Sequence, residues 1–354
     1  MSGLDQNSLK NYRPVYNLPF LSKCLERLVA AQMNDYLSSN DLYMKFQSAY
    51  RPFHRTEFAL LKVQNDILCA LIDKKDVILV LLDLSSAFDT LDHDVLLHNL
   101  SERFGFRGRV LEWFRSYLSK RNFKVCIDSL PDSDCFELLF GVPQGSVLGP
   151  ILFTLYTSPL EELKYGIDVM LHADDSQLYM VAQKISDVTG QLKACLEEVR
   201  EWMKSHLFIL NDGKTEVVHF SSTLRAGTEK LGKLRIGECD ITPSDSVPNL
   251  GVIFDEDGMM TSQIDSINKS AYYALYRIGK IRNLLDKYTT EKLVHAFVTS
   301  RLDYCNNLLM GLPGNQICKL QSVQNAAALQ YTHWKYADGL GETFFQPRCH
   351  VESS

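Results

Sequence analysis

The chain has 354 residues, of which 45% are apolar and 10% aromatic, a composition typical of a globular protein with enough apolar residues for more than one domain. Its formal charge of −6 at pH 7 excludes a protein that binds nucleic acid through bulk positive charge alone. The nine cysteines show neither Cys-x-x-Cys nor zinc-site spacing, so we interpret them as reduced residues of an intracellular protein.

The N-terminus is polar and lacks the apolar stretch of a signal peptide. Gly, Pro and charged residues interrupt every apolar run before it reaches membrane length. We therefore expect a soluble intracellular protein without membrane contact. The sequence leaves open both the choice between nucleus and cytoplasm and the oligomeric state.

Two amphipathic helices are predicted first, over residues 18–39 and 56–72, because their apolar residues recur at helical spacing. An apolar run over 77–82 follows, rich in Val, Ile and Leu, and it predicts a strand buried on both faces. Asp83 comes directly after it. A carboxylate at the end of a buried strand requires a cation or hydrogen bonds to stay ionised, so this strand predicts a partner for Asp83.

The middle of the chain predicts helices over 93–118, broken at Gly105 and Gly108, and two strands over 123–127 and 135–140. A loop with Gln144 and Gly145 leads into a helix that starts at residue 151. A plain turn from strand to helix would use Pro and Gly in the same way. The loop therefore indicates a binding role only in combination with its neighbours.

A second acidic site follows in the stretch 169–179, where apolar residues flank Asp174 and Asp175 as in a hairpin with a two-carboxylate tip. If this hairpin neighbours the strand 77–82, Asp83 and Asp174 face one another and Asp175 lies beside them. Close carboxylates repel, and Mg²⁺ relieves the repulsion because it prefers oxygen ligands. The three residues therefore predict a two-metal centre for phosphoryl transfer, with Mg²⁺ as the ion and Mn²⁺ as the alternative.

The rest of the chain predicts a helix over 186–206, a loop and strand over 208–220 that contain Lys214, and a small hairpin over 247–254. The pattern from 262 to 331 is helical, with a stop at Gly311–Gly314. Residues 332–354 have no periodicity and are expected to be disordered. Basic residues gather over 103–124 and again over 269–292, where a solvated helix face and a surface for a nucleic-acid backbone are equally compatible with the pattern.

Three motifs occur in order: 82–89 around Asp83, 141–150 around Gln144, and 173–175 with Asp174 and Asp175. Together they resemble the palm of reverse transcriptases from non-LTR retrotransposons of the jockey and chicken-repeat type, in truncated form. The likeness runs from about residue 11 to about residue 330, with further blocks at 11–23, 47–52, 211–215, 249–252 and 300–306.

The resemblance implies an α/β (α+β) right-hand polymerase. Residues 1–260 would form fingers and palm around an antiparallel core sheet, 261–331 a helical thumb-like region, and 332–354 a disordered tail. It implies an RNA-directed DNA polymerase that takes an RNA template, a DNA primer and deoxynucleoside triphosphates. We expect no endonuclease or ribonuclease H in this chain, so self-propelled transposition from it alone is not expected.

The resemblance also assigns roles. Asp83, Asp174 and Asp175 would hold the metals, and Lys214 would protonate the departing pyrophosphate, with a plain surface lysine as the alternative. The roles of nucleotide and template binding fall on four further positions: Arg51 at the triphosphate, Phe88 as a steric gate against the 2′-hydroxyl, and Gln144 and Gly145 at the template and nucleotide. A surface Arg51 and a core Phe88 are the alternatives.

Three residues depart from the family pattern. Phe53 and Arg55 stand where small residues are expected, and His172 stands where Tyr or Phe usually precedes the acidic pair. We hypothesise that His172 lowers activity without abolishing it. The departures keep a second hypothesis open, a catalytically impaired remnant that folds and at most binds nucleic acid. An RNA polymerase that copies RNA is disfavoured by Phe88.

Overall fold

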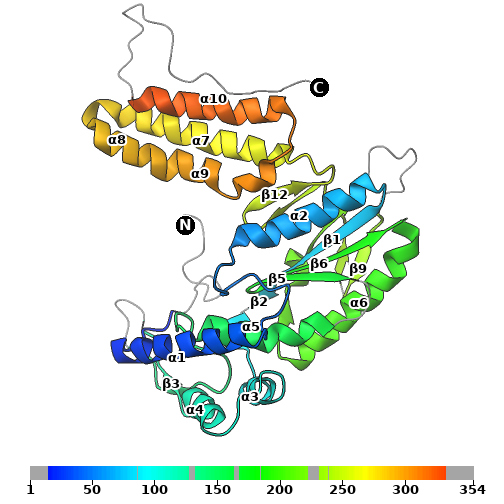
Figure 1. Ribbon diagram of the computed structural model, residues 1–354, viewed down its shortest axis with the longest axis vertical. Helices are drawn as coiled ribbons and strands as arrows, with labels where there is room; N and C mark the ends of the chain where they lie inside the picture. Colours follow the sequence, from blue (N-terminus) through cyan, green and yellow to red (C-terminus); the bar gives the residue numbers. More distant parts are fainter. Residues whose placement is uncertain are drawn as a thin grey trace, which may run out of the picture. The chain divides into compact units, whose positions relative to one another are not determined.

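The computed structural model describes residues 15–85, 87–126, 132–162, 167–183, 185–221, 231–237 and 239–331. The chain divides into two compact units, Met1–Ser262 and Gln263–Ser354 (Figure 1). Each unit has helices of its own, and only the first contains the sheet that carries the acidic residues. The predicted tail, 332–354, and residues 11–14 of the predicted block 11–23 lie outside the described residues.

The first unit is built on an antiparallel sheet with the strand order β5-β6-β1-β8. Its strands are β1 (Asp76–Leu82), β5 (Asp168–His172), β6 (Asp175–Ala182) and β8 (Glu216–Phe220). β1 is central, and six of its seven residues are buried, which confirms the strand buried on both faces. An antiparallel sheet can place strands that are distant in the chain side by side, and here it joins the two acidic segments.

The described part of this unit contains six α-helices, and their bounds agree with the predicted periodicity. They are α1 (Phe20–Ser39), α2 (Thr56–Ile72), α3 (His93–Glu102), α4 (Arg109–Leu118), α5 (Gly149–Thr157) and α6 (Ile185–Ser205). The break between α3 and α4 falls at Gly105 and Gly108, which adopt φ of 69° and 55°. Glycine occupies this left-handed region without steric cost, so the two glycines end one helix and start the next.

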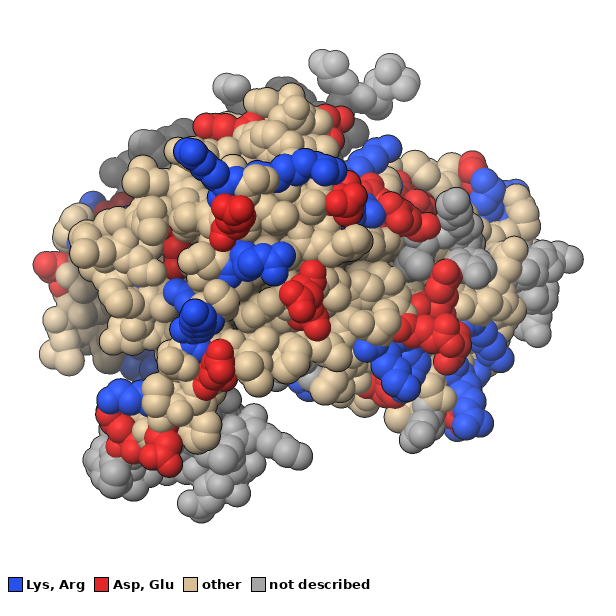
Figure 2. Space-filling view, turned by 90° about the horizontal axis from the view of Figure 1, so that it is seen from below, with Lys and Arg blue, Asp and Glu red and all other residues tan. Residues whose placement is uncertain are grey.

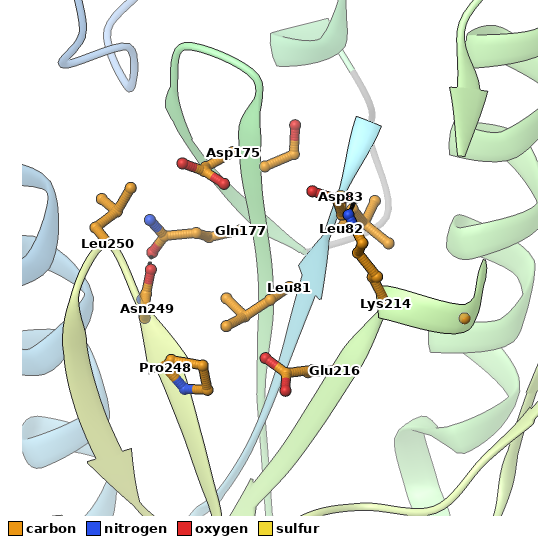
Figure 3. A pocket seen from close by; sticks show the side chains of 12 residues that line it. Leu81, Leu82, Asp83, Asp175, Gln177, Lys214, Glu216, Pro248, Asn249 and Leu250 are labelled. Atoms are coloured by element: carbon orange, nitrogen blue, oxygen red, sulfur yellow. Dashed lines mark hydrogen bonds and ion pairs between the residues drawn. The ribbon is translucent and has the colours of Figure 1, made fainter. Parts of the chain in front are cut away.

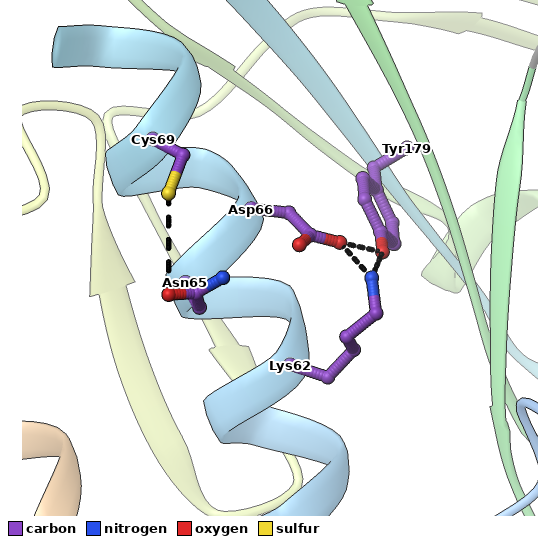
Figure 4. A network of polar contacts seen from close by, with 5 residues as sticks. All are labelled: Lys62, Asn65, Asp66, Cys69 and Tyr179. Carbon is purple, nitrogen blue, oxygen red and sulfur yellow. Dashed lines mark hydrogen bonds and ion pairs between the residues drawn. The ribbon is translucent and has the colours of Figure 1, made fainter.

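The two faces of the sheet meet different helices because side chains alternate along a strand. Ile78, Val80 and Leu82 join the large core together with residues of α3, α5 and α6. Tyr179 of β6 points to the α2 side, where its hydroxyl contacts Asp66 and lies 3.2 Å from Lys62 Nζ (Figure 4). The Lys62–Asp66 ion pair completes a network that ties α2 to the sheet.

Four short antiparallel pairings, three of them local hairpins, and one parallel bridge complete the described part of the first unit. They involve β2 (Leu84–Ser85) with β7 (Ile209–Leu210), β3 (Asn122–Phe123) with β4 (Phe136–Glu137), β9 (Leu234–Ile236) with β10 (Cys239–Ile241), β11 (Ser246–Asn249) with β12 (Val252–Asp255), and the β5 edge with a bridge at Gln47. The hairpin predicted over 247–254 is thus confirmed, whereas β3 and β4 are shorter than the predicted strands.

The second unit is helical, as the pattern predicts. It contains α7 (Thr261–Ile281), α8 (Lys287–Val294), a π-helical turn (His295–Thr299), α9 (Ser300–Asp303) and α10 (Gly314–Tyr331). Its core is formed by apolar residues of these helices, among them Ala271, Leu275, Val294, Val298 and Val323. None of the helices in the described ranges combines the length and the apolar character needed to cross a membrane. The assignment of the two units to fingers, palm and thumb stays a prediction.

Candidate functional site

Asp83 follows the last residue of β1, at the end of β1 that lies beside the start of β6. The register pairs Leu81 with Gln177 and Leu82 with Ser176, so the next position along β1 brings Asp83 opposite Asp175. The side chain of Asp83 is 39% exposed. The structure therefore brings the two acidic segments together, with Asp175 rather than Asp174 in line with Asp83.

The turn between β5 and β6 consists of Ala173 and Asp174, because His172 pairs directly with Asp175. Ala173 has a φ of 59°, in the left-handed region that costs an L-residue about 1–2 kcal/mol. Surrounding contacts must hold such a conformation. One is a hydrogen bond of 3.2 Å between His172 Nε2 and Thr56 Oγ1 at the start of α2. Burial lowers the pKa of His172, so its imidazole is neutral at neutral pH.

The carboxylates at this site repel one another. Burial, followed by the negative charges of Asp174 and Asp83, raises the pKa of Asp175 to about 6, although part of its side chain is open to solvent. A raised pKa means that a proton or a cation at this position is favoured. Three carboxylates provide the oxygen donors that suit Mg²⁺, so the residues fit the expected ion.

The carboxylates nevertheless do not form a closed ligand set. In the described part of the chain, no group of three or more His, Cys, Asp or Glu side chains is arranged to hold a metal ion. Asp83 and Asp175 line a common pocket, whereas Asp174 is not part of its lining. The prediction that all three residues hold metal therefore stays a prediction.

Lys214 lies next to Asp83. It ends a short 3-10 helix, Asp212–Lys214, and its Nζ is 3.4 Å from Asp83 Oδ2 (Figure 3). Arg200 of α6 donates from one nitrogen to both carboxylate oxygens of Asp212, at 2.8 and 2.9 Å, and so anchors this short helix. The backbone N–H of Asn211 donates to the carbonyl of Asp83 at 3.0 Å. These contacts place a cation beside the predicted catalytic carboxylate.

The pocket has a volume of about 400 Å³ and extends from the carboxylates to the β11–β12 hairpin (Figure 3). Asn249 of β11 donates to the amide oxygen of buried Gln177 at 3.0 Å, which links the hairpin to β6. Burial raises the pKa of Glu216 at the pocket wall. The residues that line the pocket are Leu81, Leu82, Asp83, Asp175, Ser176, Gln177, Gly213, Lys214, Glu216, Pro248, Asn249 and Leu250.

Gln144 and Gly145, predicted at the template and nucleotide, are outside this lining. The side-chain amide nitrogen of Gln144 donates to both carboxylate oxygens of Asp89, at 3.0 and 2.9 Å. The backbone carbonyl of Gln144 accepts from the backbone N–H of Tyr16. Gly145 has a φ of 94°, which favours glycine at that position. The loop is therefore fixed by Asp89, which ends the 3-10 helix Ala87–Asp89.

Phe88 and Arg51 are also outside the pocket lining. The ring of Phe88 stacks on Phe153 with 4.7 Å between centroids, and Phe88 packs half-buried against the core. The guanidinium of Arg51 lies over the ring of Tyr43 at 5.0 Å and donates to the carbonyl of Met44 at 3.3 Å. These contacts agree with the alternatives of a surface Arg51 and a core Phe88. The binding roles of both residues stay predictions.

Sequence reasoning missed Glu26, which is 1% exposed on α1. Its carboxylate accepts from the backbone N–H groups of Val147 and Leu148, at 2.6 and 3.4 Å, just before α5. A carboxylate is favourable at a helix N-terminus, so Glu26 holds the loop that contains Gln144. The helical periodicity could have indicated that Glu26 is buried, because it lies on the same face of α1 as buried Ala30, Met33 and Leu37.

Comparison with known proteins identifies the relatives of this chain. A family model described as reverse transcriptase (RNA-dependent DNA polymerase) matches residues 4–254. The chain is 30% identical over 309 residues to the RNA-directed DNA polymerase from the mobile element jockey of Drosophila funebris, which covers 83% of this chain and 32% of that protein. It is 26% identical over 301 residues to a probable RNA-directed DNA polymerase from transposon BS of Drosophila melanogaster, covering 82% of this chain and 32% of that protein.

The chain spans about a third of the length of these two relatives. Among solved structures, apo telomerase from Candida tropicalis matches with a TM-score of 0.47 and 12% identity, over 88% of this chain and 55% of that one. The family match and the antiparallel sheet confirm the expected α/β right-hand polymerase fold and the resemblance to non-LTR retrotransposon proteins. The chain belongs to the reverse transcriptase (RNA-dependent DNA polymerase) family.

Proposed function

We propose that this chain is an RNA-directed DNA polymerase domain that extends a DNA primer with deoxynucleoside triphosphates on an RNA template. The observation that carries the proposal is the meeting of Asp83 and Asp175 at one pocket, where burial, followed by the charges of Asp174 and Asp83, raises the pKa of Asp175 to about 6. Such carboxylates are suited to hold divalent cations between protein and phosphate. Family membership supports the same reaction class.

In the proposed reaction, the 3′-hydroxyl of the primer attacks the α-phosphate of the incoming nucleotide. The new bond joins the 3′-oxygen to phosphorus, the bond to pyrophosphate breaks, and the hydroxyl proton passes to solvent water. Asp83, Asp174 and Asp175 would hold Mg²⁺, which would supply positive charge to stabilise the attacking and leaving oxygens. Mn²⁺ can replace it on the same oxygen ligands.

Lys214 is the proposed proton donor to the leaving pyrophosphate. Its side chain is 69% exposed and its Nζ is 3.4 Å from Asp83 Oδ2, so the ammonium group lies at the pocket and can reach a phosphate there. General acid assistance of this kind is typically worth about 10²–10⁴-fold in rate. Replacement of Lys214 by Ala is therefore expected to slow incorporation by about that factor.

The second unit offers the more suitable surface for nucleic acid. On α7, Tyr273 and Tyr276 are 63% and 60% exposed, and Arg277 and Lys280 lie over their rings at 5.8 and 4.6 Å. Exposed aromatic rings stack with bases, and nearby cations attract phosphate. In the basic stretch 103–124, several cations are instead paired with acidic residues, including Arg103 with Glu162 at 2.6 Å.

Figure 2 shows how charge is distributed over one face of the molecule. Lys and Arg are interspersed there with Asp and Glu over a largely uncharged surface, without one continuous basic field. Binding of nucleic acid at this face would therefore depend on small groups of side chains rather than on the net charge of −6.

A second candidate, a folded remnant that only binds nucleic acid, is favoured by Phe53. This residue has a φ of 63°, a conformation that suits glycine, and its side chain is 98% exposed. A bulky ring would hinder close approach of the loop backbone to a phosphate. Phe53 lies within residues 47–56, the segment in which Arg51 is predicted to contact the triphosphate, so its ring stands where the reaction would need access.

Primer extension by the purified chain on an RNA template, with Mg²⁺ or Mn²⁺, separates the two candidates. The matched control is Asp174→Asn, which removes one charge and keeps the side-chain size. Incorporation that is lost only in the control supports the polymerase. If neither protein incorporates nucleotide while both bind an RNA–DNA duplex, the remnant is the better description.

A further inference from the structure

Gln47 lies beside β5, the edge strand that carries the acidic turn. The backbone N–H of Ser48 donates to the carbonyl of Leu171 at 3.0 Å, and that of Leu171 donates to the carbonyl of Phe46 at 2.8 Å. Gln47 and Leu171 thus form a parallel bridge. The segment 46–48 covers the open edge of β5, an edge that would otherwise leave backbone groups unpaired.

The side chain of Gln47 reaches from this segment to the turn itself. It is 3% exposed, and its amide oxygen accepts from the N–H of Ala49 at 2.9 Å and from the N–H of Ala173 at 3.3 Å. Both partners are donors, so only the oxygen can face them, and the orientation of the amide is determined. Its amide nitrogen has no hydrogen-bond partner among the described residues, so the oxygen provides the polar contacts of this side chain.

Ala173 is the residue whose conformation sets the direction of the following carboxylates. It holds a φ of 59° immediately before Asp174 and Asp175. A left-handed L-residue persists only where neighbouring contacts over-determine it. We propose that Gln47 is a positioning residue: its amide oxygen fixes the Ala173 N–H and thereby the geometry of the acidic turn. The catalytic consequence rests on the proposed polymerase function, whereas the structural contact does not.

Two variants test the proposal. Gln47→Met keeps a similar volume and removes the acceptor, whereas Gln47→Glu keeps an acceptor oxygen in either protonation state. Hydrogen exchange of peptides that cover residues 170–176 reports local opening of the turn. We expect Gln47→Met to accelerate exchange at Ala173 by about tenfold, the usual order for a lost buried hydrogen bond, and Gln47→Glu to stay near wild type.

A second readout is the kinetics of primer extension. Gln47→Met should lower kcat by about tenfold and change the KM for nucleotide much less, because a misdirected turn affects the reacting geometry rather than ground-state binding. Gln47→Glu should restore most of kcat. If the wild-type chain incorporates no nucleotide, the proposed function fails, and the exchange measurement still decides the role of Gln47.

The control is Gln263→Met, which removes a buried glutamine from α7 in the second unit and should leave exchange over 170–176 unchanged. Three results would overturn the proposal. The first is unchanged exchange at Ala173 in Gln47→Met. The second is equal acceleration in Gln47→Met and Gln47→Glu. The third is acceleration in β8 as large as in the turn, which would mean that Gln47 supports the whole sheet.

Discussion

Asp175→Asn should stabilise the folded protein while abolishing primer extension. In the wild type, burial and the charges of Asp174 and Asp83 raise the pKa of Asp175 from 3.8 to about 6, so ionised Asp175 is unfavourable in the folded state. An amide of the same size removes that charge. Active sites commonly contain residues that are needed for the reaction and lower the stability of the fold.

The magnitude follows from the shift. About two pKa units at 1.36 kcal/mol each correspond to roughly 3 kcal/mol, an upper bound. Because the side chain is partly exposed, solvent screening reduces this to about 1 kcal/mol. A gain of about 1 kcal/mol raises the Tm of a domain of this size by about 2–4 °C.

The sign of the pH dependence is fixed by linkage. The folded-state pKa of Asp175 is raised, so its ionisation does not lower the free energy of unfolding of wild type below about pH 4. The loss of stability grows as the pH rises and is complete above about pH 6. Thermal unfolding of wild type and Asp175→Asn should therefore differ at about pH 7 and converge near pH 4. Added MgCl₂ should narrow the difference, because a bound cation offsets the repulsion in wild type only.

The control is Asp134→Asn, at an exposed carboxylate outside the pocket lining, which should give the same Tm as wild type. Equal Tm values for wild type and Asp175→Asn at neutral pH would refute the reasoning. So would a gain that persists unchanged near pH 4, since that gain would not come from charge repulsion among residues 83, 174 and 175.

Three further predictions concern the same site. Primer extension should fall on the acid side of about pH 6, where Asp175 takes up a proton; a pH–rate profile that stays flat well below that value contradicts it. His172→Tyr should increase incorporation, with Thr56→Val as the control for loss of the His172–Thr56 hydrogen bond; no gain removes His172 as the cause of weak activity. Glu26→Leu should lower the free energy of unfolding by about 1–3 kcal/mol, because buried N–H groups of Val147 and Leu148 lose their acceptor, whereas Glu26→Gln keeps one and should lose less; a urea titration with equal midpoints for both variants would contradict this.

The sequence by itself determined the elements and their order. α2 begins and ends at the predicted residues, β1 differs by one residue, and the break between α3 and α4 falls at the predicted glycines. These features depend on local periodicity and on backbone freedom at glycine, which a few neighbouring residues fix. The sequence also predicted that the strand ends near Asp83 and Asp175 lie close together, because the order of the motifs implied it.

Only the tertiary structure decided which partner each of these side chains contacts. The register brings Asp175 rather than Asp174 opposite Asp83, and Arg51 is packed on Tyr43 instead of lining the pocket. Glu26 holds a backbone N–H 121 positions away, and Gln47 holds one 126 positions away. Periodicity indicates that a residue faces inward, but the identity of its partner depends on how distant segments pack, and no local pattern contains that information.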